Sequence, residues 1–290
     1  MSKIFTQTFR VRWSEIDANG QVGPAYYLHY LVETASDWAA TQLGVDNIET
    51  LGHIYVIRET EINLIRPLRY NDVFEFTIWL VKWQRVRGTR AFELKLKDSG
   101  EVVAQGAQEV VYLDRQSMRP TTPPEHFEEL FRIENPRVFP HQRFPKVTPP
   151  PEGAFVMQRQ VEWQDLDKLD IVNNAVYVDY AQEVAARALA AEEWPPAYLK
   201  TQGLAIANQR IHIQYQSPAV WGDKLDIVTY MLGLEDTGGV RYVAIQRAAD
   251  GARIIECIMD WMLVDQVSGK PQPLPESLTL ALKKTVALAG

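Results

Sequence analysis

Two aspartates at corresponding points of the chain, Asp17 and Asp167, have the setting that acid–base chemistry requires. Each stands in a loop shortly before an apolar run with helical spacing. A carboxylate in such a loop can act as a general base or as a nucleophile. The free N–H groups at the start of the following helix can stabilise negative charge that develops on an oxygen atom. The alternative is that each aspartate only makes turn or cap hydrogen bonds.

Polar neighbours of the two aspartates are candidates for positioning a reactant or its oxyanion. In the second loop they are Asn173 and Asn174, and in the first loop they are Asn19 and Gln21. Pro24 occupies the position that corresponds to Asn174, and because proline has no N–H it cannot donate a hydrogen bond from there. The second loop is therefore the better oxyanion site, and Asp167 is favoured over Asp17.

The two loops also differ in polarity around the aspartate. Leu169 and Ile171 make the Asp167 loop apolar, and burial there would raise the pKa of this carboxyl group, as suits a general base. The differences between the loops predict one productive site per chain.

Composition excludes several classes of protein. The hydrophobic fraction is 46% and the formal net charge is −7, which argues against a nucleic-acid partner. No run reaches the roughly 18 apolar residues that a membrane span needs, and no secretion signal opens the chain. The single cysteine, Cys257, predicts a reducing, cytoplasmic location. The five histidines lack metal-ligand spacing, and no Gly-rich phosphate loop occurs, so we expect neither metal nor cofactor.

The chain repeats itself at an offset of about 150 residues. Trp13-Ser-Glu-Ile-Asp17 aligns with Trp163-Gln-Asp-Leu-Asp167, and further along Asp72 aligns with Asp223 at an offset of 151. So many matches in register indicate a duplication. It predicts one domain at 1–135, a Pro-rich linker at 136–152 and a second domain at 153–290.

Each copy predicts the same α+β unit, in which one long helix packs on an antiparallel sheet. A first strand precedes the helix and four strands follow it. Gly44 is a stop signal for the first helix, and Pro195-Pro196 is one for the second. Turn signals between strands include Arg87-Gly88 and Gly238-Gly239. The expected strands are 5–13, 54–65, 73–83, 90–97 and 102–113, then 154–163, 205–216, 224–233, 240–247 and 252–264, with helices at 25–43 and 175–192.

This pattern resembles the hotdog-fold thioesterases. The residues that carry the resemblance to the 4-hydroxybenzoyl-CoA thioesterase-like family are Trp13, Glu15, Asp17, Gly20, Val22, Tyr27 and Tyr30, and Trp163, Asp165, Asp167, Val172, Asn173, Asn174, Tyr177 and Tyr180. Two copies in one chain resemble the double-hotdog acyl-ACP thioesterases, in which a fused pair replaces a dimer. Those enzymes carry Asp-x-Asn-x-His before the Val-Asn-Asn run, and neither copy here has the full set.

The resemblance implies a tandem hotdog whose two sheets join edge to edge into one sheet. The two domains would form a pseudo-dimer within one chain, and further homo-oligomerisation stays open. It also implies hydrolysis of acyl thioesters of coenzyme A or acyl carrier protein. A dehydratase or hydratase is an alternative, although neither loop has the histidine that such enzymes use, and a non-catalytic acyl-binding protein is another.

Two further groups of residues take possible roles from the resemblance. Glu33 and Glu183 are candidate helix carboxylates, as related single-domain enzymes sometimes use one, or else they are structural. The basic run of Lys82, Arg85, Arg87 and Arg90 could bind the phosphates of coenzyme A or an acidic carrier protein. Its alternative is a solvated hairpin.

Overall fold

The computed structural model describes residues 3–45, 52–125, 127–139 and 142–287. The chain divides into two compact units, Met1–Gln142 and Arg143–Gly290. Each unit is α+β, so the predicted fold class and the duplication are confirmed. The joining of the two sheets and the linker boundaries remain predictions. No described helix is long and apolar enough to cross a bilayer.

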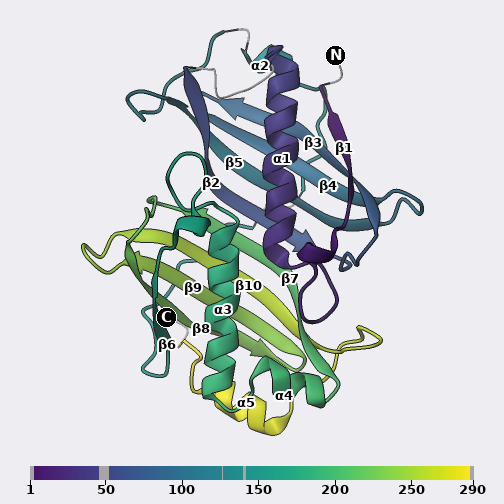
Figure 1. The fold of residues 1–290 in the computed structure, drawn as a ribbon, viewed down its shortest axis with the longest axis vertical. Coiled ribbons are helices and arrows are strands. Elements are labelled where there is room, and N and C mark those ends of the chain that lie inside the picture. Colours follow the sequence, from purple (N-terminus) through teal and green to yellow (C-terminus); the bar gives the residue numbers. More distant parts are fainter. Residues whose placement is uncertain (1–2, 46–51, 126, 140–141, 288–290) are drawn as a thin grey trace. The chain divides into compact units, whose positions relative to one another are not determined.

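Unit 1 places one long helix across an antiparallel sheet (Figure 1). Its strands are hydrogen-bonded in the order β1-β3-β4-β5-β2. The elements are β1 (Phe5–Arg10), the 3-10 turn η1 (Trp13–Glu15), α1 (Pro24–Leu43), β2 (His53–Leu64), β3 (Val73–Gln84), β4 (Arg87–Leu96), β5 (Val102–Asp114) and the short helix α2 (Phe127–Phe131).

Unit 2 repeats this arrangement, with the order β6-β8-β9-β10-β7. Its elements are β6 (Phe155–Gln160), η3 (Trp163–Asp165), α3 (Val176–Ala191), α4 (Pro196–Thr201), β7 (Leu204–Tyr215), β8 (Lys224–Glu235), β9 (Gly238–Arg247), β10 (Arg253–Asp265) and α5 (Glu276–Lys283). The four strands after the long helix correspond to those of unit 1 at a constant offset of 151 residues, as β2 and β7 show.

The long helices end where the sequence signals place them, with one addition. Gly44 takes a left-handed conformation (φ 65°) and donates its N–H to the carbonyls of Ala40 and Thr41. In unit 2, Pro195 and Pro196 do more than stop a helix. They begin the extra helix α4, because proline fits the first helical turn, where its missing N–H is not needed.

The hairpin turns lie two residues before the predicted turn signals Arg87-Gly88 and Gly238-Gly239. They are formed by residues 85–86 and 236–237, and Arg85 adopts a positive φ of 55°. Gly88 belongs to β4 instead, where a Cβ atom would lie 2.3 Å from the ring of Trp83. Gly238 belongs to β9, where a Cβ atom would lie 2.1 Å from the carbonyl oxygen of Trp261. These glycines therefore allow close packing and do not form the turns.

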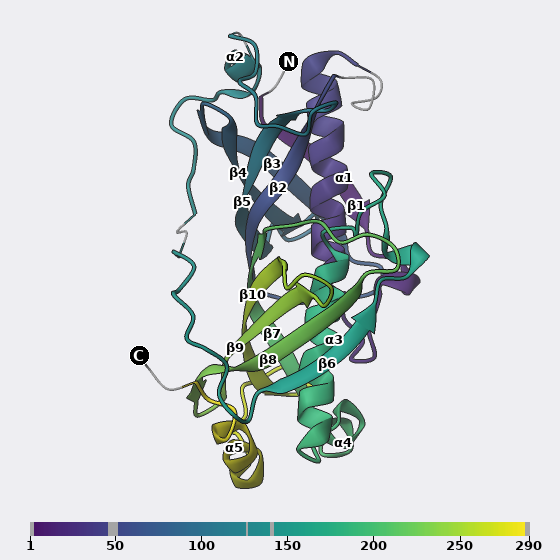
Figure 2. The same ribbon diagram turned by 90° about the vertical axis from the view of Figure 1, so that its left-hand side faces the viewer.

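The Pro-rich segment packs against the sheet of each unit on the face away from the helix (Figure 2). In unit 1, Trp79 Nε1 donates to the carbonyl of Arg137 (2.8 Å), and Phe139 packs on Trp79. In unit 2, Tyr230 Oη donates to the carbonyl of Thr148 (2.7 Å). In each unit the segment therefore covers part of the sheet face that lies away from the helix.

Candidate active site

The first carboxylate of each acidic loop is buried and structural. Glu15, which is 6% exposed, accepts the N–H of Arg12 (2.6 Å) and the hydroxyl of Tyr30 (2.5 Å). In unit 2, Asp165 is 5% exposed and accepts the hydroxyl of Tyr180 (2.6 Å). Burial and this hydrogen bond raise the pKa of both tyrosines above the ordinary range. The pair fastens the loop to the long helix fifteen residues further on.

The second carboxylate, the predicted Asp17 or Asp167, closes a tight turn. Asp17 Oδ1 accepts the N–H groups of Asn19 (2.8 Å) and Gln21 (3.2 Å). Asp167 Oδ1 accepts the N–H of Leu169 (2.7 Å), and its own N–H donates to the carbonyl of Ile171 (2.8 Å). Both aspartates therefore make the turn hydrogen bonds that the sequence allows as the alternative to catalysis. Within the described ranges, Oδ2 of each carboxylate has no hydrogen-bond partner and can accept a proton.

The surroundings of the two aspartates differ. Asp17 is exposed, whereas Asp167 is half-buried. Desolvation raises the pKa of Asp167, although the N–H of Leu169 and the charge of Lys168 oppose the shift. This is the direction that the apolar loop predicts.

The start of the helix also differs between the copies. α1 begins with Pro24, which has no N–H. In unit 2 the side chain of Asn173 accepts the N–H of Ala175 (2.9 Å), and the carbonyl of Asn174 accepts the hydroxyl of Tyr215 (3.1 Å). Among the described residues nothing accepts the backbone N–H of Asn174, so this donor is available to a bound group.

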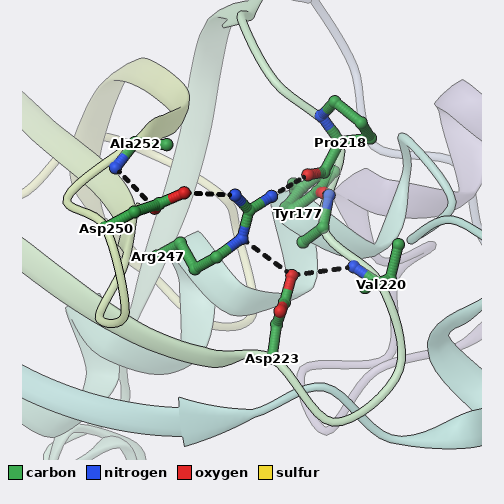
Figure 3. Close-up of polar contacts among 8 residues, drawn as sticks. Tyr177, Pro218, Val220, Asp223, Arg247, Asp250 and Ala252 are labelled. Carbon is green, nitrogen blue, oxygen red and sulfur yellow. Dashed lines mark hydrogen bonds and ion pairs between the residues drawn. The ribbon is translucent and has the colours of Figure 1, made fainter.

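A polar network braces the loop that faces this helix start (Figure 3). Arg247 binds Asp223 (3.0 Å), Asp250 (2.9 Å) and the carbonyl of Pro218 (2.7 Å). The braced loop contacts the Asp167 loop, since Val172 N–H donates to the carbonyl of Ala219 (2.9 Å). Leu96 takes the place of Arg247 in unit 1, so only the second copy has this brace.

Exposed aromatic pairs flank both acidic loops. Trp13 is 74% exposed and meets Tyr70 edge-on at 5.4 Å, and Trp163 is 70% exposed and meets Trp221 edge-on at 6.2 Å. Sequence reasoning missed these pairs because tryptophan is usually expected in a core. Their recurrence at corresponding positions was the available signal.

The predicted helix carboxylates, Glu33 and Glu183, lie in the middle of the two long helices. Glu33 is exposed, and Glu183 accepts Nε of Arg187 one turn along the same helix (2.5 Å). A carboxylate that was not predicted, Asp179, stands in the first turn of α3. Desolvation raises its pKa to about 6, against the opposing charge of Arg159.

The basic run is divided by the structure. Lys82, Arg85 and Arg87 lie exposed at the β3–β4 hairpin, whereas Arg90 donates to the buried side chain of Gln108. The twelve residues of β3 separate this hairpin from the Asp17 loop, a distance of about 36 Å at 3.3 Å per residue. Because of this separation, unit 1 does not bring its basic hairpin to its aspartate. Lys82 instead lines a surface pocket of about 500 Å³. No group of three metal-binding side chains gathers in the described part of the chain.

Comparison with solved structures reveals the same fold in proteins described as thioesterases. A putative oleoyl thioesterase from Lactobacillus plantarum is 16% identical with a TM-score of 0.76, and the match covers 94% of this chain and 97% of the other. An acyl-ACP thioesterase from Bacteroides thetaiotaomicron is 16% identical with a TM-score of 0.73, and the match covers 90% of this chain and 100% of the other. The 12:0-ACP thioesterase from Umbellularia californica is 16% identical with a TM-score of 0.69, and the match covers 90% of this chain and 95% of the other.

The fold is therefore the tandem hotdog that the sequence predicts. No curated protein matches the chain. A family profile described as the thioesterase-like superfamily matches residues 11–131 and again residues 161–282. These two matches cover most of both repeats, and the chain belongs to the thioesterase-like superfamily.

Proposed function

We propose that the chain hydrolyses acyl thioesters of coenzyme A or of acyl carrier protein to the free acid and the thiol. Membership of the superfamily supports the reaction class. One observation carries the assignment to unit 2: a half-buried carboxylate with a raised pKa, Asp167, lies just before a helix start whose Asn174 N–H is free. Unit 1 offers an exposed Asp17 and a proline instead.

The residues of this site supply both parts that hydrolysis needs. Asp167 takes a proton from a water molecule, and the water oxygen forms a bond to the carbonyl carbon of the thioester. The carbonyl oxygen becomes an oxyanion that the N–H of Asn174 stabilises. When the carbon–sulfur bond breaks, the departing thiolate receives the proton from Asp167. The Leu169 N–H holds the carboxylate by Oδ1 throughout.

The site has the features of one productive cleft per chain. The Arg247 brace and the free N–H occur in the second copy alone, whereas the tyrosine-fastened carboxylate is common to both. We assign hydrolysis to the second copy and a supporting role to the first. The single cysteine is a buried thiol, in keeping with a reducing, cytoplasmic compartment.

A panel of acyl-CoA and acyl-carrier thioesters, incubated with the protein and a thiol reagent, tests this function. We expect release of free thiol at a rate that increases with protein concentration. Loss of enoyl absorbance without thiol release would show a hydratase. Saturable binding of the thioesters with neither reaction would show an acyl-binding protein. Either of the last two results contradicts the proposal.

A further inference from the structure

Two hydrogen bonds converge on one peptide group at the start of α3, the group that joins Asn174 to Ala175. Its carbonyl oxygen accepts the hydroxyl of Tyr215 (3.1 Å), and its N–H donates to Oδ1 of Asn173 (2.9 Å). A peptide group has one donor and one acceptor, and side chains engage both of them here. We call these two bonds the α3 peptide clamp.

The preceding peptide group, which carries the Asn174 N–H, is held as well. Its carbonyl oxygen, that of Asn173, accepts the N–H of Val176 (3.0 Å). Asn174 therefore lies between two peptide groups that hydrogen bonds hold in place. Because each group is planar, the φ and ψ angles of Asn174 are the only freedom between them. The clamp restricts that freedom and keeps the Asn174 N–H in one direction.

The sheet of unit 2 holds Tyr215 in its turn. Tyr215 is the half-buried last residue of β7 and pairs with Ile255 of β10. Its ring lies 6.1 Å from the ring of Tyr177, a residue of α3 that is 2% exposed. Helix ends fray, whereas a paired strand with a packed side chain gives a fixed reference. The clamp thus ties the start of the helix to the sheet.

The first repeat has the same fold without the clamp. Gly23 and Leu64 stand at the positions of Asn173 and Tyr215. Glycine has no side chain and leucine has no polar atom, so neither can form the corresponding bond. The position of Asn174 holds Pro24 in this repeat, which has no N–H to direct. The clamp and the N–H that it directs are therefore lost together.

A different tyrosine bond, present in both repeats, shows what the common fold uses. Tyr27 Oη accepts the N–H of Leu68 (3.0 Å), and Tyr177 Oη accepts the N–H of Ala219 (3.3 Å). Each joins the long helix to the loop between two strands. Because this bond already fastens the helix in both copies, the clamp of unit 2 is an addition that the fold does not require.

We infer that Tyr215 is a positioning residue for hydrolysis, acting through the α3 peptide clamp on the Asn174 N–H. The inference rests on the proposed function, since it takes this N–H to be the oxyanion donor. A preorganised donor stabilises the developing charge because it needs no reorientation during the reaction. Tyr215 acts through the backbone and not on the thioester, so its hydroxyl matters to the transition state more than to substrate binding.

Steady-state thiol release by Tyr215→Phe, with a melting curve, tests this role. The variant keeps the ring beside Tyr177 and removes only the hydroxyl. We expect kcat to fall by about 10-fold to 100-fold, the scale of a misplaced catalytic group, while KM changes by less than about twofold. Tyr230→Phe is the matched control and should keep the kcat of the parent. It removes a bond of the same kind, from a tyrosine hydroxyl to the carbonyl of Thr148 (2.7 Å), elsewhere in unit 2.

Exchanges of Asn173 test the other side of the clamp, and they keep the test available if Tyr215→Phe does not fold. Asn173→Ala removes the acceptor of the Ala175 N–H and should lower kcat by a similar factor. Asn173→Ser should recover much of that loss, because a serine hydroxyl accepts the same kind of turn hydrogen bond. Both bonds hold one peptide group, so the two losses should not multiply in the double variant. Losses that multiply fully would overturn the clamp.

Amide hydrogen exchange separates the clamp from the proposed function. The Ala175 amide should exchange faster in Tyr215→Phe than in the parent or in Tyr230→Phe, and an unchanged rate would overturn the clamp. Full kcat in a folded Tyr215→Phe protein would overturn the positioning role and retain the proposed function. No thiol release by the parent on any thioester would reject the proposed function, and the positioning role with it.

Discussion

Exchanging Asn174 for proline tests the oxyanion donor by making unit 2 resemble unit 1 at one position. Asn174→Pro removes the backbone N–H that has no partner among the described residues, and no described hydrogen bond of that N–H is lost. Pro24 already occupies the equivalent place at the start of α1, and Asn174 stands two residues before the first residue of α3, Val176, so proline there interrupts no helical hydrogen bond. The variant should therefore fold with a Tm near that of the parent.

The expected loss of activity follows from the role of a single oxyanion donor. Removing one such donor typically reduces kcat by about 100-fold to 1000-fold, which corresponds to roughly 2.7–4 kcal/mol. Asn174→Ala removes the side chain and keeps the N–H, so it should lose much less. Pro24→Asn, the reverse exchange in unit 1, should change kcat little, because we assign no hydrolysis to the first copy.

Steady-state thiol release on one good substrate, with melting curves of each variant, gives the comparison. A folded Asn174→Pro protein with full kcat would refute the oxyanion assignment. An equal loss in Asn174→Ala would move the role from the backbone to the side chain.

Three further predictions concern stability. The pKa of Asp167 is raised in the folded state, so its charge destabilises the fold above that pKa. Asp167→Asn should therefore raise Tm at neutral pH. This gain in Tm should fade as the pH falls through the raised pKa and on to the ordinary aspartate range. A gain that persists in acid would contradict the shift. Tyr180→Phe leaves Asp165 without its hydroxyl partner and should cost about 1.5–3 kcal/mol in denaturant unfolding; an unchanged midpoint would mean that the contact is not formed. Gly88→Ala places a Cβ atom against the Trp83 ring and should lower Tm, whereas Gly52→Ala, which meets nothing within 4 Å, is the comparison, and an equal effect of both would contradict the packing argument.

The sequence predicts the architecture well where the signals are local and repeated. Gly44 stops α1 because a left-handed residue is required there. The four strands after the long helix recur at one offset because no residue is inserted among them. The turn predicted at Gly88 was wrong. In sequence, a glycine that allows a tryptophan ring to approach cannot be told from a glycine that forms a turn.

The candidate site was predictable in its residue types and less so in its contacts. Asp167 and Asn174 could be found from the motif and from the absence of an N–H in proline. The bond between Tyr180 and Asp165 joins residues fifteen apart, and no local pattern announces it. In unit 1, aromatic side chains from α1, α2 and three strands meet around Tyr112 and Phe127, and such long-range contacts appear only once the fold is known.

The most direct test of the central claim is the turnover of Asp167→Asn beside that of Asp17→Asn on one thioester that the parent hydrolyses. We expect Asp167→Asn to lower kcat by on the order of 100-fold or more, the scale of a lost general base, and to remain folded because asparagine Oδ1 can still accept the Leu169 N–H. Asp17→Asn should keep most of the activity of the parent. Full turnover by the folded Asp167→Asn protein, or a larger loss in Asp17→Asn, would contradict the account.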